Sequence, residues 1–172
     1  MSPDGGDPLA ERFLSVEGRE RMQKAIAELR EWLGDRLSVN ETVREQHGHG
    51  EASGRTYAPD AVVWPEGTDE VSRIVRTCAN HEVPVIAFGA GTSLEGHVSA
   101  PYGGICVDMT RMNQVLEVRE ADADCVVQPG VTREQLNAYL RDTGLFFPVD
   151  PGANASIGGM VSTRASGTTT IR

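Results

Sequence analysis

Two stretches of small residues constrain this chain more than any other feature. The first, Val83 to His97 (VPVIAFGAGTSLEGH), runs from an apolar segment into a loop that has glycine at positions 89, 91 and 96. Such a loop lets the backbone approach a ligand, and its N–H groups can point at an anion. The second stretch, Asp150 to Gly167 (DPGANASIGGMVSTRASG), is almost free of bulky side chains. Because each glycine adds to the entropy lost on folding, turns alone do not account for both stretches.

The first loop fits neither of two familiar phosphate-binding motifs. In the dinucleotide fingerprint G-x-G-x-x-G the third glycine falls at Leu94, and turn residues rather than a helix follow the loop, although Asp108 lies near the distance of the ribose-binding acid. In the P-loop motif, His97 and Val98 stand where lysine and a hydroxyl are required, and Lys24 is the only lysine. An ordinary β-turn and a backbone anion site remain, and the second stretch favours the anion site.

The formal charge of −9 narrows the class of ligand. It disfavours nucleic acid as a partner, because polyanion binding needs clustered positive charge and no basic run occurs. A loop that binds phosphate through backbone dipoles needs no net positive charge. Two such surfaces could enclose one long, flat ligand that carries phosphate, and a flavin dinucleotide has that shape.

The rest of the pattern predicts alternating helices and strands. Apolar residues at helical spacing, followed by Gly34, predict a helix over 17–33, and the polar stretch 38–60 is expected to be a connector. Further on we expect strands at 61–65, 83–88 and 103–109, and a helix at 68–80 with Thr68 as its N-cap. A hairpin is expected to turn at Ala121 to Asp124. The helix after it is expected to begin with Thr132 and Gln135 as a capping box and to end at Gly144. After Ile157 no terminal helix or strand is expected. This alternation is typical of α/β or α+β folds.

The cysteines and histidines predict neither a disulfide, nor a metal site, nor a catalytic residue. The three cysteines lie far apart and are interpreted as isolated, buried thiols: Cys78, Cys106 and Cys125. His47 and His49 form an H-x-H pair in the expected connector, incidental unless they bind a metal. His81 is expected in water at a helix end, and His97 is interpreted as a loop residue rather than a base.

The amino-terminal residues are acidic and lack the apolar segment of a secretion signal and the arginines of a transit peptide. No run reaches the length of a membrane-spanning helix. We therefore expect a cytoplasmic protein without a transmembrane segment, with peripheral membrane association of the full enzyme as a further option. Because the small-residue ending contains no element that ties down the chain, we also expect the domain to be truncated.

Two segments together resemble a known family. They are PDAVVWPEGTDEVSRIVRTCANHEVPVIAFGAGTSLEGH, starting at Pro59, and VVQPGVTREQLNAYLRDTGLFFPVDPGANASIGGMVSTRASGT, starting at Val126. In order and spacing they are similar to the FAD-binding domain of the vanillyl-alcohol-oxidase (PCMH-type) superfamily, closest to cytochrome-type FAD-dependent D-lactate dehydrogenases and next to glycolate oxidase FAD subunits. The resemblance covers roughly residues 40–172. It implies an α+β fold of two small α/β subdomains at 56–172, truncated, with an N-terminal helix and connector at 1–55.

The resemblance also implies cofactor contacts. Residues of the first loop would cradle the FAD diphosphate: Gly89, Ala90, Gly91, Thr92 and Ser93. Residues of the second stretch would line the isoalloxazine and ribityl side: Pro151, Gly152, Ser156, Gly158 and Gly159, with Ser166 and Gly167 adding contacts. Pro129 and Gly130 would form the turn near the cofactor. FAD is expected to be non-covalent, because no histidine lies between 89 and 96. Gly50 and Ala52 stand where relatives carry an acid and a hydroxyl, so no role is assigned to that segment.

The activity implied by the resemblance is oxidation of a D-2-hydroxy acid, D-lactate to pyruvate being favoured, by hydride transfer to flavin. The substrate-binding cap domain, the base and the metal ligands of the family would lie beyond Arg172, so the 172 residues alone are expected to be inactive. The electron acceptor is not indicated. A glycolate or 2-hydroxyglutarate dehydrogenase, and a non-catalytic or degenerate flavin- or nucleotide-binding fragment, are the alternatives.

Overall fold

The computed structural model describes residues 7–51 and 56–167. Two compact units share the chain: the first contains Met1–Ala87 and Ser93–Asp108, and the second contains Phe88–Thr92 and Met109–Arg172. The first small-residue loop is therefore divided, because Gly89 to Thr92 belong to the second unit and Ser93 to the first. The predicted domain boundary between residues 55 and 56 stays a prediction.

The first unit is built around a four-stranded sheet in the order β1-β2-β4-β3. Its strands are β1 Leu37–Ser38, β2 Ala61–Val63, β3 Val85–Phe88 and β4 Ile105–Asp108. β1 pairs antiparallel with β2, and β2 pairs parallel with β4. All residues of β2 are buried, and so is β4 as a whole. Buried, mostly apolar strands of this kind form the centre of a sheet that other elements cover on both faces.

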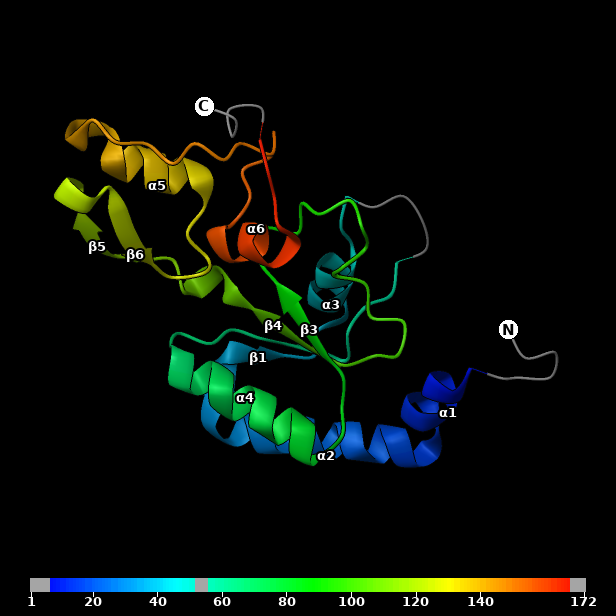
Figure 1. The fold of residues 1–172 in the computed structure, drawn as a ribbon. Coiled ribbons are helices and arrows are strands. Elements are labelled where there is room, and N and C mark those ends of the chain that lie inside the picture. Colours follow the sequence, from blue (N-terminus) through cyan, green and yellow to red (C-terminus); the bar gives the residue numbers. More distant parts are fainter. Residues whose placement is uncertain (1–6, 52–55, 168–172) are drawn as a thin grey trace. The chain divides into compact units, whose positions relative to one another are not determined.

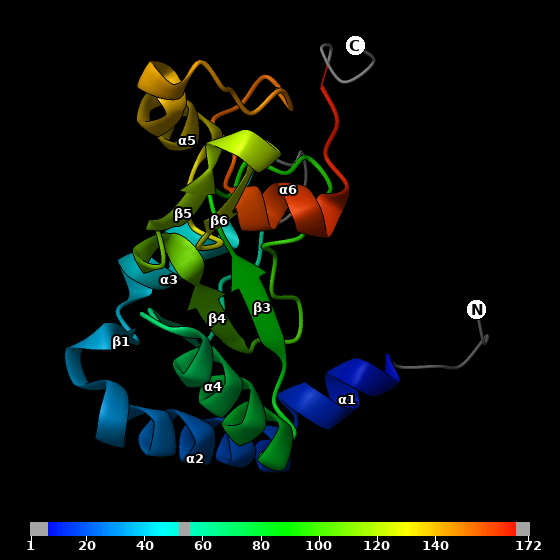
Figure 2. The same cartoon turned by 60° about the vertical axis from the view of Figure 1, so that its left-hand side comes forward.

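The described part of the first unit contains the α-helices α1 Pro8–Leu14, α2 Val16–Leu33, α3 Glu41–Gly48 and α4 Thr68–Asn80. Helices α2 and α4 run side by side (Figures 1 and 2), and the Thr77 hydroxyl donates to the Glu28 carboxylate at 2.8 Å between them. The helix predicted over 17–33 is confirmed as α2, which Gly34 ends with φ +55°. Helix α4 begins at Thr68 and has Gly67 as its N-cap, so the Thr68 cap was wrong by one residue.

The second unit, as far as it is described, contains an antiparallel hairpin and the α-helices α5 and α6. Strand β5 Val115–Arg119 pairs with β6 Asp124–Val127, as predicted, and Ala123 turns the chain with φ +53°. Helix α5 Arg133–Leu140 lies beside the hairpin (Figure 2) and buries Leu136 and Leu140 against it. The unit thus has a small core of its own.

Three expectations about local structure were wrong or incomplete. The stretch 38–60 is not only a connector, because it contains α3, whose N-cap Asn40 accepts a hydrogen bond from Val43 N–H at 3.3 Å. A helix also follows Ile157: α6 Ile157–Thr163, which starts where the Ser156 hydroxyl accepts from Gly159 N–H at 3.3 Å. The Thr132 hydroxyl caps α5 as predicted, while the Gln135 amide donates to the carbonyl of Asn113. We did not predict α3 and α6 because their sequences are polar and glycine-rich, although each begins at a residue whose side chain caps the helix.

No helix within residues 7–51 and 56–167 is both long enough and apolar enough to cross a membrane.

Candidate cofactor-binding site

The two small-residue stretches meet inside the second unit. A Cβ added to Gly89 would lie 2.3 Å from the Ser156 Oγ, closer than any real side chain tolerates. Gly91 has φ +69°, and a Cβ there would come within 3.1 Å of the Phe88 ring. The backbone at Gly89 therefore approaches the start of α6 in a way that only glycine allows.

Backbone donors remain available in this loop. Throughout the described residues, the N–H groups of Ala90, Gly91 and Thr92 find no hydrogen-bond acceptor within the chain. Ala90 is exposed, and Gly91 and Thr92 are half-buried. Such N–H groups must bond to water or to a ligand, because an unpaired buried donor costs free energy. Their succession in a glycine-rich turn is the arrangement that suits an anion.

The start of α6 is different, because its amides already have partners. Ile157 N–H donates to the Val131 carbonyl at 2.7 Å, and Gly158 N–H donates to the Pro129 carbonyl at 2.8 Å. Gly159 N–H bonds to the Ser156 hydroxyl, which is buried. These donors hold the second stretch against the turn at 129–131, so they are not free to bind phosphate.

Packing within the chain explains several glycines of the second stretch. A Cβ on Gly158 would lie 2.6 Å from the Pro129 Cβ, and one on Gly167 would lie 2.4 Å from the Asp150 nitrogen. The two ends of the stretch therefore lie against each other. Gly152 has φ +88° in a turn that the Asp150 carboxylate closes by accepting Gly152 N–H at 2.9 Å. Pro151 and Ser166 are exposed.

Ser93 lies in the first unit and pairs with a histidine. Its Oγ is 2.7 Å from the His97 Nδ1, and it also accepts from Glu95 N–H at 3.4 Å. His97 is exposed. His97, which we interpreted from the sequence as a loop residue, therefore contacts Ser93, one of the five residues expected to bind the FAD diphosphate.

A buried network around Asp108 was missed by sequence reasoning. The His47 Nε2 lies 2.9 Å and the Trp64 Nε1 2.7 Å from the Asp108 Oδ2, while the His47 Nδ1 lies 2.8 Å from the Val43 carbonyl. Both neighbours of the imidazole are acceptors, so the doubly protonated, positively charged form of His47 is the one that satisfies both hydrogen bonds. Burial opposes that charge, but the hydrogen bonds to Asp108 and Val43 prevail and raise the pKa of His47.

The structure corrects the interpretation of two histidines. His47 is not incidental in a mobile connector: its side chain is 12% exposed and joins α3 to the end of β4. His81 is not simply solvated, since its Nε2 lies 2.8 Å from the Glu28 carboxylate on α2. Nothing local in the sequence signals either pair, because 61 and 53 residues separate the partners.

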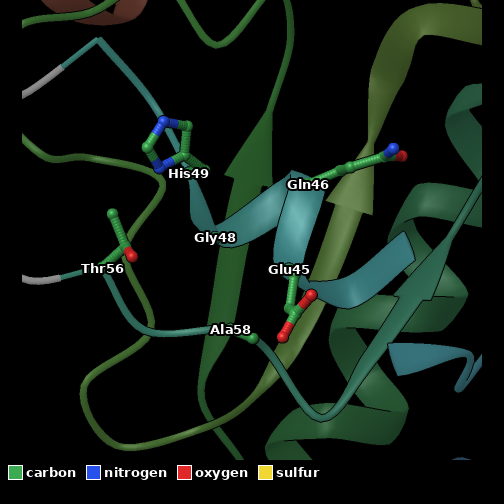
Figure 3. Close-up of a pocket in the computed structure, with 6 residues that line it drawn as sticks. All are labelled: Glu45, Gln46, Gly48, His49, Thr56 and Ala58. Atoms are coloured by element: carbon green, nitrogen blue, oxygen red, sulfur yellow. The ribbon is translucent and has the colours of Figure 1, made fainter. Parts of the chain in front are cut away.

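An open hollow of about 570 Å³ lies elsewhere in the first unit, between the end of α3 and the segment from Thr56 to Ala58. Figure 3 shows the side chains of Glu45, Gln46 and His49 pointing away from one another. Gly48 closes the floor, because a Cβ there would lie 2.5 Å from the Tyr57 carbonyl oxygen. The hollow contains none of the residues expected to bind cofactor and no convergent chemical groups. In the described ranges no three metal-ligating side chains gather.

Comparison with known proteins places this chain in a family. The family described as "FAD binding domain" matches residues 59–172. The chain is 48% identical over 152 residues to a probable mitochondrial D-lactate dehydrogenase of Danio rerio, covering 88% of the chain and 31% of the relative. It is 40% identical over 170 residues to the mitochondrial cytochrome-type D-lactate dehydrogenase of Arabidopsis thaliana, covering 98% and 30%. It is 39% identical over 111 residues to the glycolate oxidase subunit GlcD of Bacillus subtilis, covering 63% and 24%.

Solved structures agree on the fold. Alkyldihydroxyacetonephosphate synthase matches with a TM-score of 0.77 and 25% identity, covering 86% of this chain and 31% of that one. p-Cresol methylhydroxylase matches with a TM-score of 0.66 and 24% identity, covering 76% and 26%. The chain spans about a third or less of the relatives that it matches. The predicted α+β, PCMH-type fold is confirmed, and this chain belongs to the FAD binding domain family.

Proposed function

We propose that this chain is the FAD-binding portion of an oxidoreductase that oxidises a D-2-hydroxy acid, with D-lactate as the preferred substrate. The observation that carries the proposal is the loop at Gly89 to Thr92. Its backbone donors at residues 90–92 are unused within the described chain, while Gly89 is pressed against Ser156 of the second stretch. Relatives named as D-lactate dehydrogenases support the substrate class.

The loop and the second stretch take different parts in this proposal. Gly89, Ala90, Gly91, Thr92 and Ser93 bind the diphosphate, because their N–H and hydroxyl groups offer donors without positive charge. Backbone donors suit a chain of net charge −9 whose sequence contains no run of basic residues. The second stretch forms a wall: Pro151, Gly152, Ser156, Gly158, Gly159, Ser166 and Gly167 line the isoalloxazine and ribityl side. Its amides at the start of α6 hold that wall in place instead of binding phosphate.

When bound, FAD supplies the acceptor for the hydride that leaves the hydroxy acid. The role of this chain's own residues is to bind the diphosphate, to fix the orientation of the flavin and to exclude water on one side. A base for the substrate hydroxyl must lie within hydrogen-bond reach of it. We assign that base, the substrate carboxylate site, the metal ligands and the electron acceptor to no residue of this chain.

The particular hydroxy acid is a proposal of its own. Relatives of this chain are named as D-lactate dehydrogenase, glycolate oxidase subunit and D-2-hydroxyglutarate dehydrogenase. D-Lactate is favoured because the relatives of that name reach 48% identity, against 39% and 38% for the other two. Dye-coupled oxidation of the three acids by the natural full-length protein distinguishes them, and the 172-residue chain alone is expected to oxidise none.

Two further points belong to the same proposal. FAD is held without a covalent bond, because residues 89–96 contain no histidine. Release of the intact cofactor on denaturation would support this, and flavin retained on the unfolded protein would refute it.

We propose the cytoplasm as the location, although the named eukaryotic relatives are mitochondrial. Fractionation of cells that produce the natural protein tests this, including its association with membrane surfaces.

Titration of the purified 172-residue chain with FAD tests the cofactor proposal. We expect weak, reversible binding, visible as a change in flavin fluorescence and in the ³¹P resonances of FAD, and lost on desalting. Gly91→Ala is expected to weaken binding at least tenfold, because a side chain at φ +69° costs about 1–2 kcal/mol and reshapes the loop. Riboflavin, which lacks the diphosphate, is expected to bind less tightly than FAD.

Gly34→Ala is the matched control. Gly34 also has a positive φ, +55°, but it ends α2 and a Cβ there meets nothing within 4 Å. The variant is expected to lose stability and keep FAD affinity. Equal loss of FAD affinity in both variants would show that general destabilisation, not the loop, governs binding. No FAD signal at any protein concentration would favour a degenerate fragment that binds nothing.

A further inference from the structure

The segment that leads into the second small-residue stretch runs back along helix α5 (Figure 1). Asn137 holds it at Phe147, because the Asn137 Oδ1 accepts Phe147 N–H at 2.7 Å and the Nδ2 donates to the Phe147 carbonyl at 3.3 Å. One turn earlier in the helix, the Arg133 Nη1 donates to the Asp150 Oδ2 at 3.2 Å. Residues four apart lie on the same face of a helix. This polar face of α5 therefore holds the segment at two points.

Asp150 carries the second of these anchors into the stretch itself. Its other carboxylate oxygen, Oδ1, accepts Gly152 N–H at 2.9 Å and closes the turn in which Gly152 has φ +88°. A Cβ on Gly167 would lie 2.4 Å from the Asp150 nitrogen, so the far end of the stretch packs on the same residue. Asp150 is thus the point at which both ends of the proposed flavin wall are held to α5.

The Arg133 guanidinium is only partly satisfied by its partners. Its Nε is buried and, within residues 7–51 and 56–167, has no hydrogen-bond partner. Its Nη2 lies 3.6 Å from the Glu134 Oε1, and the Glu134 side chain is 63% exposed. An unpaired buried donor opposes folding and calls for an explanation. We therefore explain the arginine by the placement of Asp150 and not by a gain in stability.

We propose that Arg133 is a positioning residue for the flavin: through Asp150 it fixes the turn at residues 150–152, which faces the isoalloxazine and ribityl groups. The inference rests on the proposed function, because it takes the second stretch as the wall that lines the flavin. Arg133 acts through Asp150 and is assigned no contact with the cofactor. The diphosphate loop meets the wall elsewhere, at Gly89 and Ser156. Loss of Arg133 should therefore affect the flavin half of FAD and spare the diphosphate.

Titration of the 172-residue chain with FAD, riboflavin and ADP tests this division. Riboflavin has the isoalloxazine and ribityl groups without the diphosphate, and ADP has the diphosphate without the flavin. Arg133→Gln is expected to weaken FAD and riboflavin binding about three- to tenfold, the contribution of one partly exposed, charged hydrogen bond, and to leave ADP affinity unchanged. Flavin fluorescence follows the first two ligands, and amide NMR shifts follow all three.

Arg119→Gln is the matched control. Arg119 belongs to the same unit, and its Nε lies 2.7 Å from the Asp124 Oδ1 within the hairpin. The variant also loses an arginine and an ion pair, and it is expected to keep all three affinities. Asp150→Asn tests the pair from its other side, because it removes the charge and keeps an oxygen for Gly152 N–H. It is expected to show the same selective loss, to which Arg133→Gln adds nothing.

A second readout does not depend on affinity. At saturating FAD, the Gly152 amide is expected to shift in wild type and in Arg119→Gln, and to shift less in Arg133→Gln, while the amides of residues 90–92 shift in all three proteins. Equal loss of FAD and ADP affinity in Arg133→Gln, or no loss of either, would overturn the inference and leave the proposed function standing. Absence of FAD binding to the wild-type chain would refute the proposed function, and this inference with it.

Discussion

Replacing Gly89 by alanine probes the contact that joins the two small-residue stretches. The new Cβ would lie 2.3 Å from the Ser156 Oγ, whereas real Cβ atoms essentially never approach another atom within 3.0 Å. The two atoms must therefore separate by about 0.7 Å. Ser156 cannot yield freely, because it is 2% exposed and its hydroxyl caps α6. We expect the variant to lose about 1–3 kcal/mol of unfolding free energy, the usual cost of overpacking.

A double-mutant cycle with Ser156→Ala isolates the clash. That change removes the Oγ and keeps the Cβ, which would lie 3.4 Å from a Cβ at Gly89. Alone it is expected to cost about 1 kcal/mol, the value of a lost N-cap. In the double variant the alanine at position 89 has room, so its cost is expected to fall by about 1–3 kcal/mol.

Urea unfolding, followed by NMR cross-peaks of the α5 and α6 amides, measures these energies in the second unit. Tryptophan fluorescence would report on the first unit instead, because Trp32 and Trp64 both belong to it. If the double variant loses as much unfolding free energy as the two single variants together, Gly89 and Ser156 do not touch. That result would refute the close approach of the two stretches on which the candidate site depends.

Other predictions concern buried ionisable groups. Because the pKa of His47 is raised above 6.5, the stability that its charged form contributes is present below that value and is lost as the pH rises through the raised pKa. Thermal unfolding at stepped pH should show this decline in wild type and not in His47→Gln. The same change of stability with pH in both proteins would contradict it. Asp108→Asn leaves His47 without its carboxylate partner and should lower the unfolding free energy, measured in urea, by about 3–5 kcal/mol. A loss below about 1 kcal/mol would refute the buried pair. Burial raises the pKa of Cys78 to about 11 and of Cys106 to about 12. A thiol reagent should therefore label half-buried Cys125 first in the folded protein and all three cysteines in urea, as mass spectrometry would show; early labelling of Cys78 would be the contrary result.

Local patterns predicted local structure well. The cap at Thr132, the glycine end at Gly34 and the hairpin around Ala123 appear where the sequence placed them. Helix α5 ends earlier than predicted, at Leu140, and Gly144 closes the 3-10 turn Arg141–Thr143 that follows it. Each depends on a few consecutive residues, whose turn and capping preferences do not need the rest of the fold. Helix α6 escaped prediction because its glycines are poor helix formers, and tertiary packing of Gly158 on Pro129 overrides that preference.

Pairs far apart in the chain could not be predicted from these patterns. His47 and Asp108 are 61 residues apart and meet only because α3 packs against the end of β4. The buried thiols could be anticipated in part: Cys78 and Cys106 are buried, while Cys125 is only half-buried because β6 has one face towards α5. Burial depends on which face of an element the fold covers, and short elements carry little periodic signal about that.

The sequence by itself determined which groups the two stretches can offer: small side chains, hydroxyls and backbone N–H groups, with no lysine, in a chain of net charge −9. Only the tertiary structure decided which of these backbone donors have partners within the described residues. The amides at the start of α5 bond to Ala155 and Asn154, and those at the start of α6 bond to Val131 and Pro129. Within residues 7–51 and 56–167, the N–H groups of residues 90–92 have no acceptor. Hydrogen-bond partners are assigned by the packing of distant segments, so two similarly glycine-rich stretches differ in the backbone donors that have partners.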